Sequence, residues 1–216
     1  MIPARLTGII DYGAGNLGSV ENALRQLGAN ARLVKNPEEI AINSPFEKII
    51  FPGDGHFATA MEKLDASGFS RAIREWISAD KPFLGICIGL QLLFDSSEET
   101  LQNETNDGSA VSRGLGVFPG TVKKFPGRKI PQIGWNSTKA CKNKGIFRDI
   151  PQDTFFYYIH SFYAAPADIG IIAAKTEYYL EYCSAVESGS VAAIQFHPEK
   201  SGRWGLKLLQ NWLEGK

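Results

Sequence analysis

The sequence of 216 residues has few cysteines, no net charge and no long apolar run. Cys87, Cys141 and Cys183 are odd in number and form no C-x-x-C pair, which argues against a zinc site or a redox dithiol. Basic and acidic side chains balance at 23 each, which argues against nucleic acid or an anionic membrane as the main partner. No apolar segment reaches the roughly 18 residues of a membrane span, and the first seven residues show no secretory pattern. We therefore expect a cytoplasmic protein in which one cysteine is available as a nucleophile.

The remaining composition is that of a globular protein. Apolar residues make up 44% of the chain and charged residues 21%, close to the averages for folded domains. One α/β domain commonly reaches this length, and no internal repeat divides the chain. We expect a single domain over residues 1–216.

The N-terminal half alternates short apolar runs with amphipathic stretches. Strands are predicted at 6–11, 31–34, 48–51 and 82–87, and helices at 16–27, about 58–79 and from 89 to 94. This order predicts an α/β fold with a parallel sheet covered by helices on both faces. After residue 114, shorter strands predicted at 114–118, 121–125, 155–160, 170–175 and 191–196 favour antiparallel additions to the same sheet. The polar stretch 96–112 predicts a surface loop.

The strongest chemical signal is a cysteine between two glycines, in the pattern G-x-C-x-G formed by Gly85, Cys87 and Gly89. In the related G-x-S-x-G turn, the nucleophile lies on a tight bend between a strand and a helix, where glycines allow the backbone to approach closely. The helix N-terminus favours the thiolate, which is the attacking form of cysteine. The alternative is a buried structural cysteine at the end of a strand.

A cysteine nucleophile needs a base, and His197 at the end of an apolar strand is the best placed of the three histidines. If the backbone stays extended through Pro198, Glu199 projects to the same side and orients the imidazole. Cys87, His197 and Glu199 together predict a catalytic relay. Taken alone, the H-P-E tripeptide also fits an ordinary turn.

A second strand runs into a glycine-bearing loop at residues 52–56, with the sequence PGDGH. Backbone N–H groups in such a loop stabilise the oxyanion that forms when a carboxamide is attacked. We assign this role to the N–H groups of Gly55 and Ile88. A plain turn is the alternative, and a structural or partner-contact role is expected for His56.

Residues 13–18 also satisfy the dinucleotide pattern G-x-G-x-x-G after the first strand. The second strand ends at Val34 without an acidic residue to hold a ribose, although Lys35 leaves a phosphorylated ribose open. A nucleotide-dependent enzyme is therefore kept as an alternative to the relay.

With these segments side by side, the chain resembles the class I (triad) glutamine amidotransferases. Within this family it is similar to the glutaminase subunits of imidazole glycerol phosphate synthases, which serve histidine biosynthesis. The resemblance runs nearly end to end and is carried by DYGAGN at 11–16, PGDG at 52–55, LGIC at 84–87, GWN at 134–136, IHSFY at 159–163 and QFHPEK at 195–200.

The resemblance implies a flavodoxin-like fold with a central, mostly parallel sheet. It also implies glutamine hydrolysis through a γ-glutamyl thioester on Cys87, without a metal or organic cofactor. Ammonia would pass to a (β/α)8-barrel cyclase subunit in a heterodimer. Carried over by position, the residues that hold glutamine are Gln91, Glu99, Ser161 and Phe162. Those that face the partner are Asn16, Trp135 and Lys200.

Two positions depart from the commoner family pattern. Asp54 stands where the oxyanion loop usually has an apolar residue, and Gln132 stands where a histidine usually precedes GWN. Because a carboxylate beside an oxyanion would raise the barrier, we expect Asp54 to point away from it. The departures leave open a related glutaminase that serves sugar amidination. A binding module that has lost catalysis is a further alternative.

Overall fold

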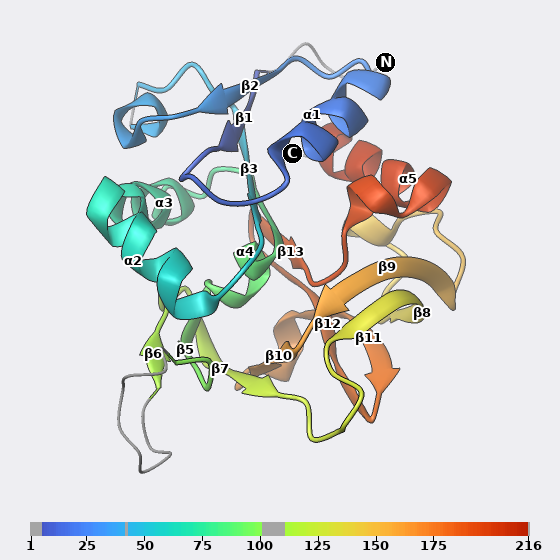
Figure 1. The fold of residues 1–216 in the computed structure, drawn as a ribbon. Coiled ribbons are helices and arrows are strands. Elements are labelled where there is room, and N and C mark those ends of the chain that lie inside the picture. The colour runs from blue at the N-terminus through green and yellow to red at the C-terminus, as the bar shows by residue number, and fades with distance from the viewer. Residues whose placement is uncertain (1–5, 42, 101–110, 216) are drawn as a thin grey trace.

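The computed structural model describes residues 6–41, 43–100 and 111–215, and Figure 1 shows their path. Within these ranges the strands form one extended sheet in the order β2-β1-β3-β4-β13-β12-β10-β7-β5-β6. A second arm leaves β12 through β11, β8 and β9. Among the described residues, no helix is long and apolar enough to cross a membrane.

The strands are β1 (Thr7–Ile10), β2 (Ala31–Val34), β3 (Lys48–Gly53), β4 (Phe83–Cys87), β5 (Phe94–Ser97), β6 (Ser112–Arg113), β7 (Phe118–Lys124), β8 (Gln132–Ala140), β9 (Thr154–His160), β10 (Phe162–Pro166), β11 (Ile172–Tyr178), β12 (Leu180–Ser188) and β13 (Val191–Ile194). The α-helices are α1 (Leu17–Gln26), α2 (Phe57–Ser67), α3 (Phe69–Ser78), α4 (Ile88–Gln91) and α5 (Gly202–Glu214). Short 3-10 turns include Pro198–Lys200, which follows β13.

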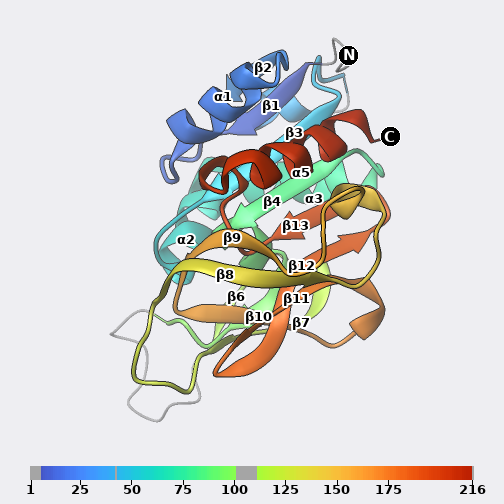
Figure 2. The same ribbon diagram turned by 90° about the vertical axis from the view of Figure 1, so that its right-hand side faces the viewer.

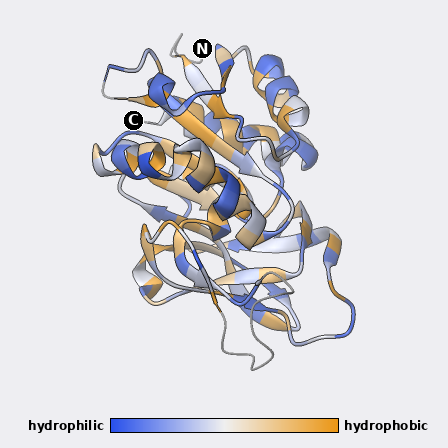
Figure 3. Cartoon of the chain, turned by 60° about the vertical axis from the view of Figure 1, so that its left-hand side comes forward, coloured by the Kyte–Doolittle hydropathy of each residue, from blue (hydrophilic) through white to orange (hydrophobic). Residues whose placement is uncertain are grey.

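The first part of the sheet, from β2 to β13, is parallel throughout. Strands β1, β3, β4 and β13 are buried along their whole length, as expected for strands covered on both faces. Helices α1 and α5 cover one face, and α2 and α3 cover the other (Figure 2). Figure 3 shows the corresponding pattern, with apolar strands inside and helices that carry both polar and apolar residues. The predicted α/β fold with a central, mostly parallel sheet and flanking helices is confirmed.

The antiparallel half contains most of the differences from the predicted elements. The helix after Cys87 ends at Gln91 rather than Phe94, because Phe94 begins β5 beside β7. Residues 114–117 are not a strand, and β7 starts only at Phe118. Strands β8, β10 and β12 and helix α5 were not predicted. The predicted loop 96–112 is shorter in the structure, because its ends belong to β5 and β6, which pair with each other. Residues 101–110 of that loop lie outside the described residues.

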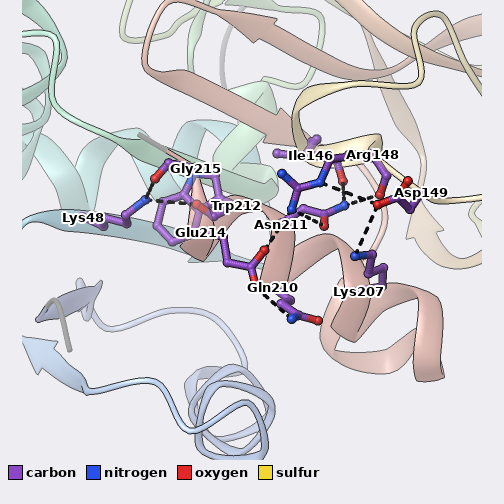
Figure 4. A network of polar contacts seen from close by, with 10 residues as sticks. All are labelled: Lys48, Ile146, Arg148, Asp149, Lys207, Gln210, Asn211, Trp212, Glu214 and Gly215. Carbon is purple, nitrogen blue, oxygen red and sulfur yellow. Dashed lines mark hydrogen bonds and ion pairs between the residues drawn. The ribbon is translucent and has the colours of Figure 1, made fainter. Parts of the chain in front are cut away.

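The C-terminal helix is fastened at its end by a buried lysine at the start of β3 (Figure 4). The Lys48 ammonium donates to the backbone carbonyls of Trp212 and Gly215 and lies over the Trp212 ring. On the neighbouring side, the Asn211 amide donates to the carbonyls of Ile146 and Arg148. These bonds satisfy carbonyls that the helix and the neighbouring 3-10 turn leave open. They hold α5 against the sheet directly after the turn that carries Glu199.

Candidate active site

Cys87 occupies a bend that only the surrounding glycines make possible. The residue ends β4 and precedes α4, with a φ of 56°, a left-handed conformation that costs energy in a cysteine. A Cβ atom at Gly89 would lie 2.1 Å from the carbonyl oxygen of Phe51, and one at Gly85 would lie 2.7 Å from the carbonyl oxygen of Gly89. Both positions therefore require glycine so that β3, β4 and α4 can meet behind the thiol.

The helix after Cys87 is shorter than the predicted one. It contains four residues, Ile88–Gln91, and breaks before β5. Since the macrodipole is a sum over aligned peptide units, one turn supplies less stabilisation of a thiolate than the longer helix would.

His197 and Glu199 form a buried pair beside the thiol. The His197 Nδ1 atom lies 2.8 Å from the Glu199 Oε1 atom, and both side chains are at least nine-tenths buried. The expectation of an extended backbone through Pro198 was wrong, because residues Pro198–Lys200 form a 3-10 turn. Within that turn the Ser201 hydroxyl donates to the His197 carbonyl and accepts from the Tyr157 N–H, which fixes the turn against β9.

The electrostatics of this pair favour a protonated imidazole. Burial alone would lower the pKa of His197, but its interactions with Cys87 and Glu199 together raise that pKa to about 10. Glu199 is bound to Nδ1, and the buried Nε2 atom has no hydrogen-bond partner. A proton on Nε2 is therefore available to a group that enters the cavity, which His197 and Cys87 both line.

Apart from its interaction with His197, the sulfur makes only long contacts. The Gln195 amide donates to Cys87 Sγ at 3.8 Å, and Cys87 Sγ lies 3.9 Å from the Ile159 carbonyl oxygen. A thiol or thiolate held this loosely keeps its reactive lone pair for an incoming carbon atom. Chemically, the arrangement offers a nucleophile, a proton donor and a carboxylate that orients the donor.

A cavity of about 300 Å³ opens over the sulfur. With the exceptions of Glu199 and Trp135, every residue predicted for the site lines it. Glu199 lies behind His197, to which it is bound. These residues come from the loop before α1, from the ends of β3, β4, β5 and β9, from α4, from the start of β10 and from the turn after β13. The topology therefore brings together segments that are far apart in sequence.

The predicted substrate residues are held by hydrogen bonds of their own. The Gln91 amide nitrogen donates to the Phe162 carbonyl and to the Gln195 Oε1 atom, both at 3.0 Å. The amide oxygen of Gln91 is therefore the atom directed to a ligand. The Glu99 Oε2 atom accepts from the Phe57 N–H at 2.8 Å and so caps α2.

The loop predicted to supply the oxyanion donor lies against the first glycine-rich loop. Gly55 has a φ of 91° and lines the cavity together with Ile88. The Asp54 Oδ1 atom accepts from the Gly15 N–H at 2.9 Å, and not from the N–H groups of Gly55 or Ile88 that are predicted to bind the oxyanion. Asp54 nevertheless lines the cavity. His56 is not among the residues that line it and precedes α2.

In the dinucleotide-like segment, Gly15 is packed closely against the neighbouring loop, whereas Gly13 and Gly18 have open space where a Cβ atom would lie. A Cβ atom at Gly15 would approach the Gly53 Cα to 3.3 Å, and the Gly13 carbonyl accepts from the Lys63 ammonium. The Asn16 side chain accepts from the Ser19 N–H and caps α1. These contacts tie the segment to α1 and to the neighbouring loop.

Beside the cavity, the hairpin of β8 and β9 presents an apolar outer face. Ile133, Trp135, Phe155 and Ile159 are 40–62% exposed, an unusual concentration of large apolar side chains. Trp135 packs edge-on against Tyr157. The Lys200 ammonium lies 5.9 Å from the centre of the same Tyr157 ring, which links this face to the cavity.

Sequence reasoning missed several buried polar residues of the site. Gln195 contacts both Cys87 and Gln91, and its place two residues before His197 was the one available signal. His160 lines the cavity and is bonded to the Phe162 carbonyl and to Tyr182. Nothing in the spacing of the sequence points to Tyr182, because its strand reaches the site only through the tertiary fold.

Comparison with known proteins places this geometry in a family. The family model "Glutamine amidotransferase class-I" matches residues 8–215. The chain is 45% identical over 207 residues to "Imidazole glycerol phosphate synthase subunit HisH" of Dehalococcoides mccartyi, covering 95% of each chain. It is 43% identical over 209 residues to the protein of that name in Chlorobaculum tepidum, covering 95% of this chain and 98% of the relative.

Solved structures agree on the fold. The structure of PurLQS from Thermotoga maritima aligns with a TM-score of 0.74 at 18% identity, covering 97% of this chain and 98% of the other. A structure described as a glutamine amidotransferase aligns with a TM-score of 0.71 at 19% identity, covering 97% and 99%.

Proposed function

The chain belongs to the class-I glutamine amidotransferase family and is a glutamine amidotransferase, and from this premise we propose that it is the glutaminase subunit of imidazole glycerol phosphate synthase in histidine biosynthesis. The observation that carries the proposal is the buried relay of Cys87, His197 and Glu199 at the base of one cavity. Near full-length identity of 43–45% to subunits of that synthase supports the choice of reaction.

In the proposed reaction, the Cys87 thiolate attacks the side-chain carboxamide carbon of glutamine. The carbonyl electrons move to oxygen, and the oxyanion is held by the N–H groups of Gly55 and Ile88. When the C–N bond breaks, His197 gives its proton to the departing ammonia and leaves a γ-glutamyl thioester. His197 then takes a proton from water, which attacks the thioester and releases glutamate. Glu199 holds the imidazole and stabilises its charge in both steps.

The head group of glutamine fits the far side of the same cavity. We assign its ammonium to the Gln91 amide oxygen and to the Glu99 carboxylate, since both are acceptors at the cavity wall. The backbone of Ser161 and Phe162 completes this pocket. These roles rest on the family resemblance together with the placement of all four residues around one space.

The partner is a cyclase subunit, and we propose a (β/α)8-barrel that docks on the face formed by the β8–β9 hairpin and the cavity rim. Trp135 supplies the aromatic anchor, and Asn16 and Lys200 lie at the mouth of the cavity from which ammonia would leave. The complex would be a heterodimer in the cytoplasm. We also propose that residues 1–216 form one domain, which the continuous sheet of the described ranges supports.

Control by the partner is part of the proposal. Gly53 and Gly55 allow the loop at 52–56 to exchange between two backbone states, and a loaded partner would favour the state that offers N–H groups to the oxyanion. Equal glutaminase rates with and without the loaded partner would contradict this control.

A second candidate is a related glutaminase that feeds a different synthase, for instance in sugar amidination. Asp54 and Gln132 favour it, because both depart from the commoner family pattern at the site.

The deciding experiment measures glutamate release and acceptor amination with the purified chain, alone and with a barrel cyclase subunit and its phosphoribosyl acceptor. We expect little release alone and strong stimulation by the loaded partner, abolished in Cys87→Ala. Cys87-dependent release without stimulation would keep the glutaminase and favour the second candidate. No release under any condition would contradict both.

A further inference from the structure

Beside the proposed glutamine pocket, three buried side chains form a chain of hydrogen bonds that ends on a pocket carbonyl. The Gln132 amide lies 3.0 Å from the Tyr182 hydroxyl, which lies 3.2 Å from His160 Nε2. His160 Nδ1 lies 2.7 Å from the Phe162 carbonyl oxygen. The side-chain residues of the chain, Gln132, Tyr182 and His160, are each at most 6% exposed. Gln132 and His160 face each other directly across β8 and β9.

The proton positions in this chain follow from its two ends. A carbonyl oxygen only accepts, so His160 must carry its proton on Nδ1. Burial, and to a smaller degree the charge of His197, hold the pKa of His160 down to about 4, so at neutral pH this is its one ring proton. Nε2 therefore accepts, and the single hydroxyl proton of Tyr182 is used to donate to it.

The Tyr182 oxygen is then left as an acceptor toward Gln132, and the Gln132 amide must donate through its nitrogen. In the structure the Gln132 oxygen lies toward Tyr182, and the Gln132 nitrogen is buried without a partner. Because amide oxygen and nitrogen are assigned from their partners, the amide can be turned. Turning the amide gives that nitrogen an acceptor. Every donor in the chain then points toward Phe162.

We propose that Gln132 is a positioning residue for the glutamine pocket, which sets the tautomer of His160 through Tyr182 and thereby fixes the Phe162 carbonyl. This rests on the proposed function, because the pocket is that of its substrate. The carbonyl also accepts from the Gln91 amide at 3.0 Å, so its position determines where the Gln91 oxygen meets the substrate. The next residue of β8, Ile133, belongs to the exposed face proposed for the partner.

The requirement at position 132 is a hydrogen-bond donor toward Tyr182, rather than glutamine itself. A histidine donor satisfies it, which explains how this chain departs from the commoner pattern and keeps the pocket. A carboxylate does not, because it would accept the hydrogen bond of the Tyr182 hydroxyl in place of His160. His160 would then have to donate from Nε2, either as a doubly protonated ring or by giving up its bond to the Phe162 carbonyl.

The test combines nitrogen NMR of the three histidines with glutamine kinetics of the partner-stimulated complex. In the wild-type chain at neutral pH we expect His160 as the neutral Nδ1–H tautomer. Gln132→Glu should place a proton on Nε2 and raise KM for glutamine about tenfold or more, with kcat changed much less, since one pocket bond is lost. Gln132→His should keep the wild-type tautomer and a KM within about threefold.

Gln132→Met removes the donor without adding a charged acceptor. It provides the same test if Gln132→Glu does not fold. It should leave the Nδ1–H tautomer less populated and raise KM by less than Gln132→Glu. A wild-type His160 protonated on Nε2, or an unchanged KM in both Gln132→Glu and Gln132→Met, would overturn the proposal. The NMR measurement needs no enzymatic activity. Absence of glutaminase activity would therefore contradict the proposed function and still leave the hydrogen-bond chain of Gln132, Tyr182 and His160 testable.

Discussion

The two halves of the sheet build their parts of the site by different means. In the parallel half, Cys87 is placed by backbone contacts, with Gly89 against the Phe51 carbonyl and a strained φ at the cysteine. In the antiparallel half, the wall of the cavity is placed by side-chain hydrogen bonds from His160 and Tyr182. Close backbone packing of this kind tolerates almost no substitution of the few glycines involved. A side-chain network tolerates exchange of residues that keep the same donor.

His197 lies where the two halves meet. It follows β13, whose one neighbour, β4, is parallel and whose other, β12, is antiparallel. Its N–H donates to the Tyr157 carbonyl of β9, so the turn that carries the base is fixed by the antiparallel half. The relay therefore depends on correct assembly of both.

The largest effect should come from the carboxylate at this junction. Glu199→Gln keeps the size of the side chain but removes the charge that stabilises the His197 imidazolium. We expect stimulated glutaminase turnover to fall by about 10³-fold with the fold retained. Glu181→Gln, in an exposed ion pair with Lys175, is the matched control and should be neutral. A Glu199→Gln enzyme as active as the wild type would show that the pair is only structural.

The same variant also tests the His197–Glu199 pair through the pH dependence of the unfolding free energy. The pKa of His197 is raised from 6.5 to about 10, so the stabilisation by the charged imidazole is complete below pH 6.5 and is lost as the pH rises through 10. Urea unfolding of the wild type should lose up to about 1.4 kcal/mol per pH unit in this window. Glu199→Gln should show a shallower loss, and identical slopes would contradict the assignment.

The next largest effect is expected at Gly89, where close backbone packing requires a glycine. Gly89→Ala forces a Cβ atom to 2.1 Å from a backbone oxygen, and we expect unfolding free energy to fall by about 3 kcal/mol or more. Gly18→Ala in α1 is the matched control, because no atom lies within 4 Å of the added Cβ. It should be neutral or slightly stabilising. Equal stability of the two variants would mean that the backbone around Cys87 shifts freely to accept the added Cβ atom.

A moderate effect is expected on the outer face of the antiparallel half. Trp135→Ala should weaken binding of the barrel subunit about 30-fold, as removal of an aromatic anchor does. Ile169→Ala removes another large apolar side chain, which is 78% exposed in the 3-10 turn Ile169–Ile171, and should leave binding unchanged. Calorimetry or surface-based binding would measure both. Loss of affinity in neither variant would place the partner on another face.

The smallest effect is expected at Asp54 in the parallel half. Its carboxylate is bound to the Gly15 N–H, so only its backbone serves the proposed oxyanion loop. Asp54→Val should leave partner-stimulated glutaminase within about tenfold, since one exposed hydrogen bond is lost. Asp54→Asn, which keeps an acceptor, should be closer to the wild type. A loss of several orders of magnitude would mean that the side chain acts on the reacting atoms.

The contrast between the halves also explains how far the sequence reached. Local patterns predicted the turn at Cys87 between two glycines and the succession of the first four strands along the chain. Each of these features depends on residues that are close together in the chain. The pairing of His197 with Glu199 was expected, but through an extended backbone rather than the observed 3-10 turn. Local spacing could not distinguish the two backbones.

The residues that escaped prediction are those whose role exists only in three dimensions. Tyr182 joins His160 to Gln132 from β12, a strand that was not predicted. Helix α5 also escaped, and the buried Lys48 that holds it gives no periodic signal. Networks of this kind depend on strand register and on long-range pairing, which the local patterns of one sequence do not encode.

The most direct test of the proposed glutaminase reaction is to trap its covalent intermediate. The chain with its loaded partner is mixed with glutamine, quenched in acid during turnover, and analysed by mass spectrometry of the intact protein and of its peptides. We expect one added γ-glutamyl group on Cys87, absent in Cys87→Ala. Turnover that proceeds without any such adduct, or an adduct on Cys141 or Cys183, would contradict the proposed reaction.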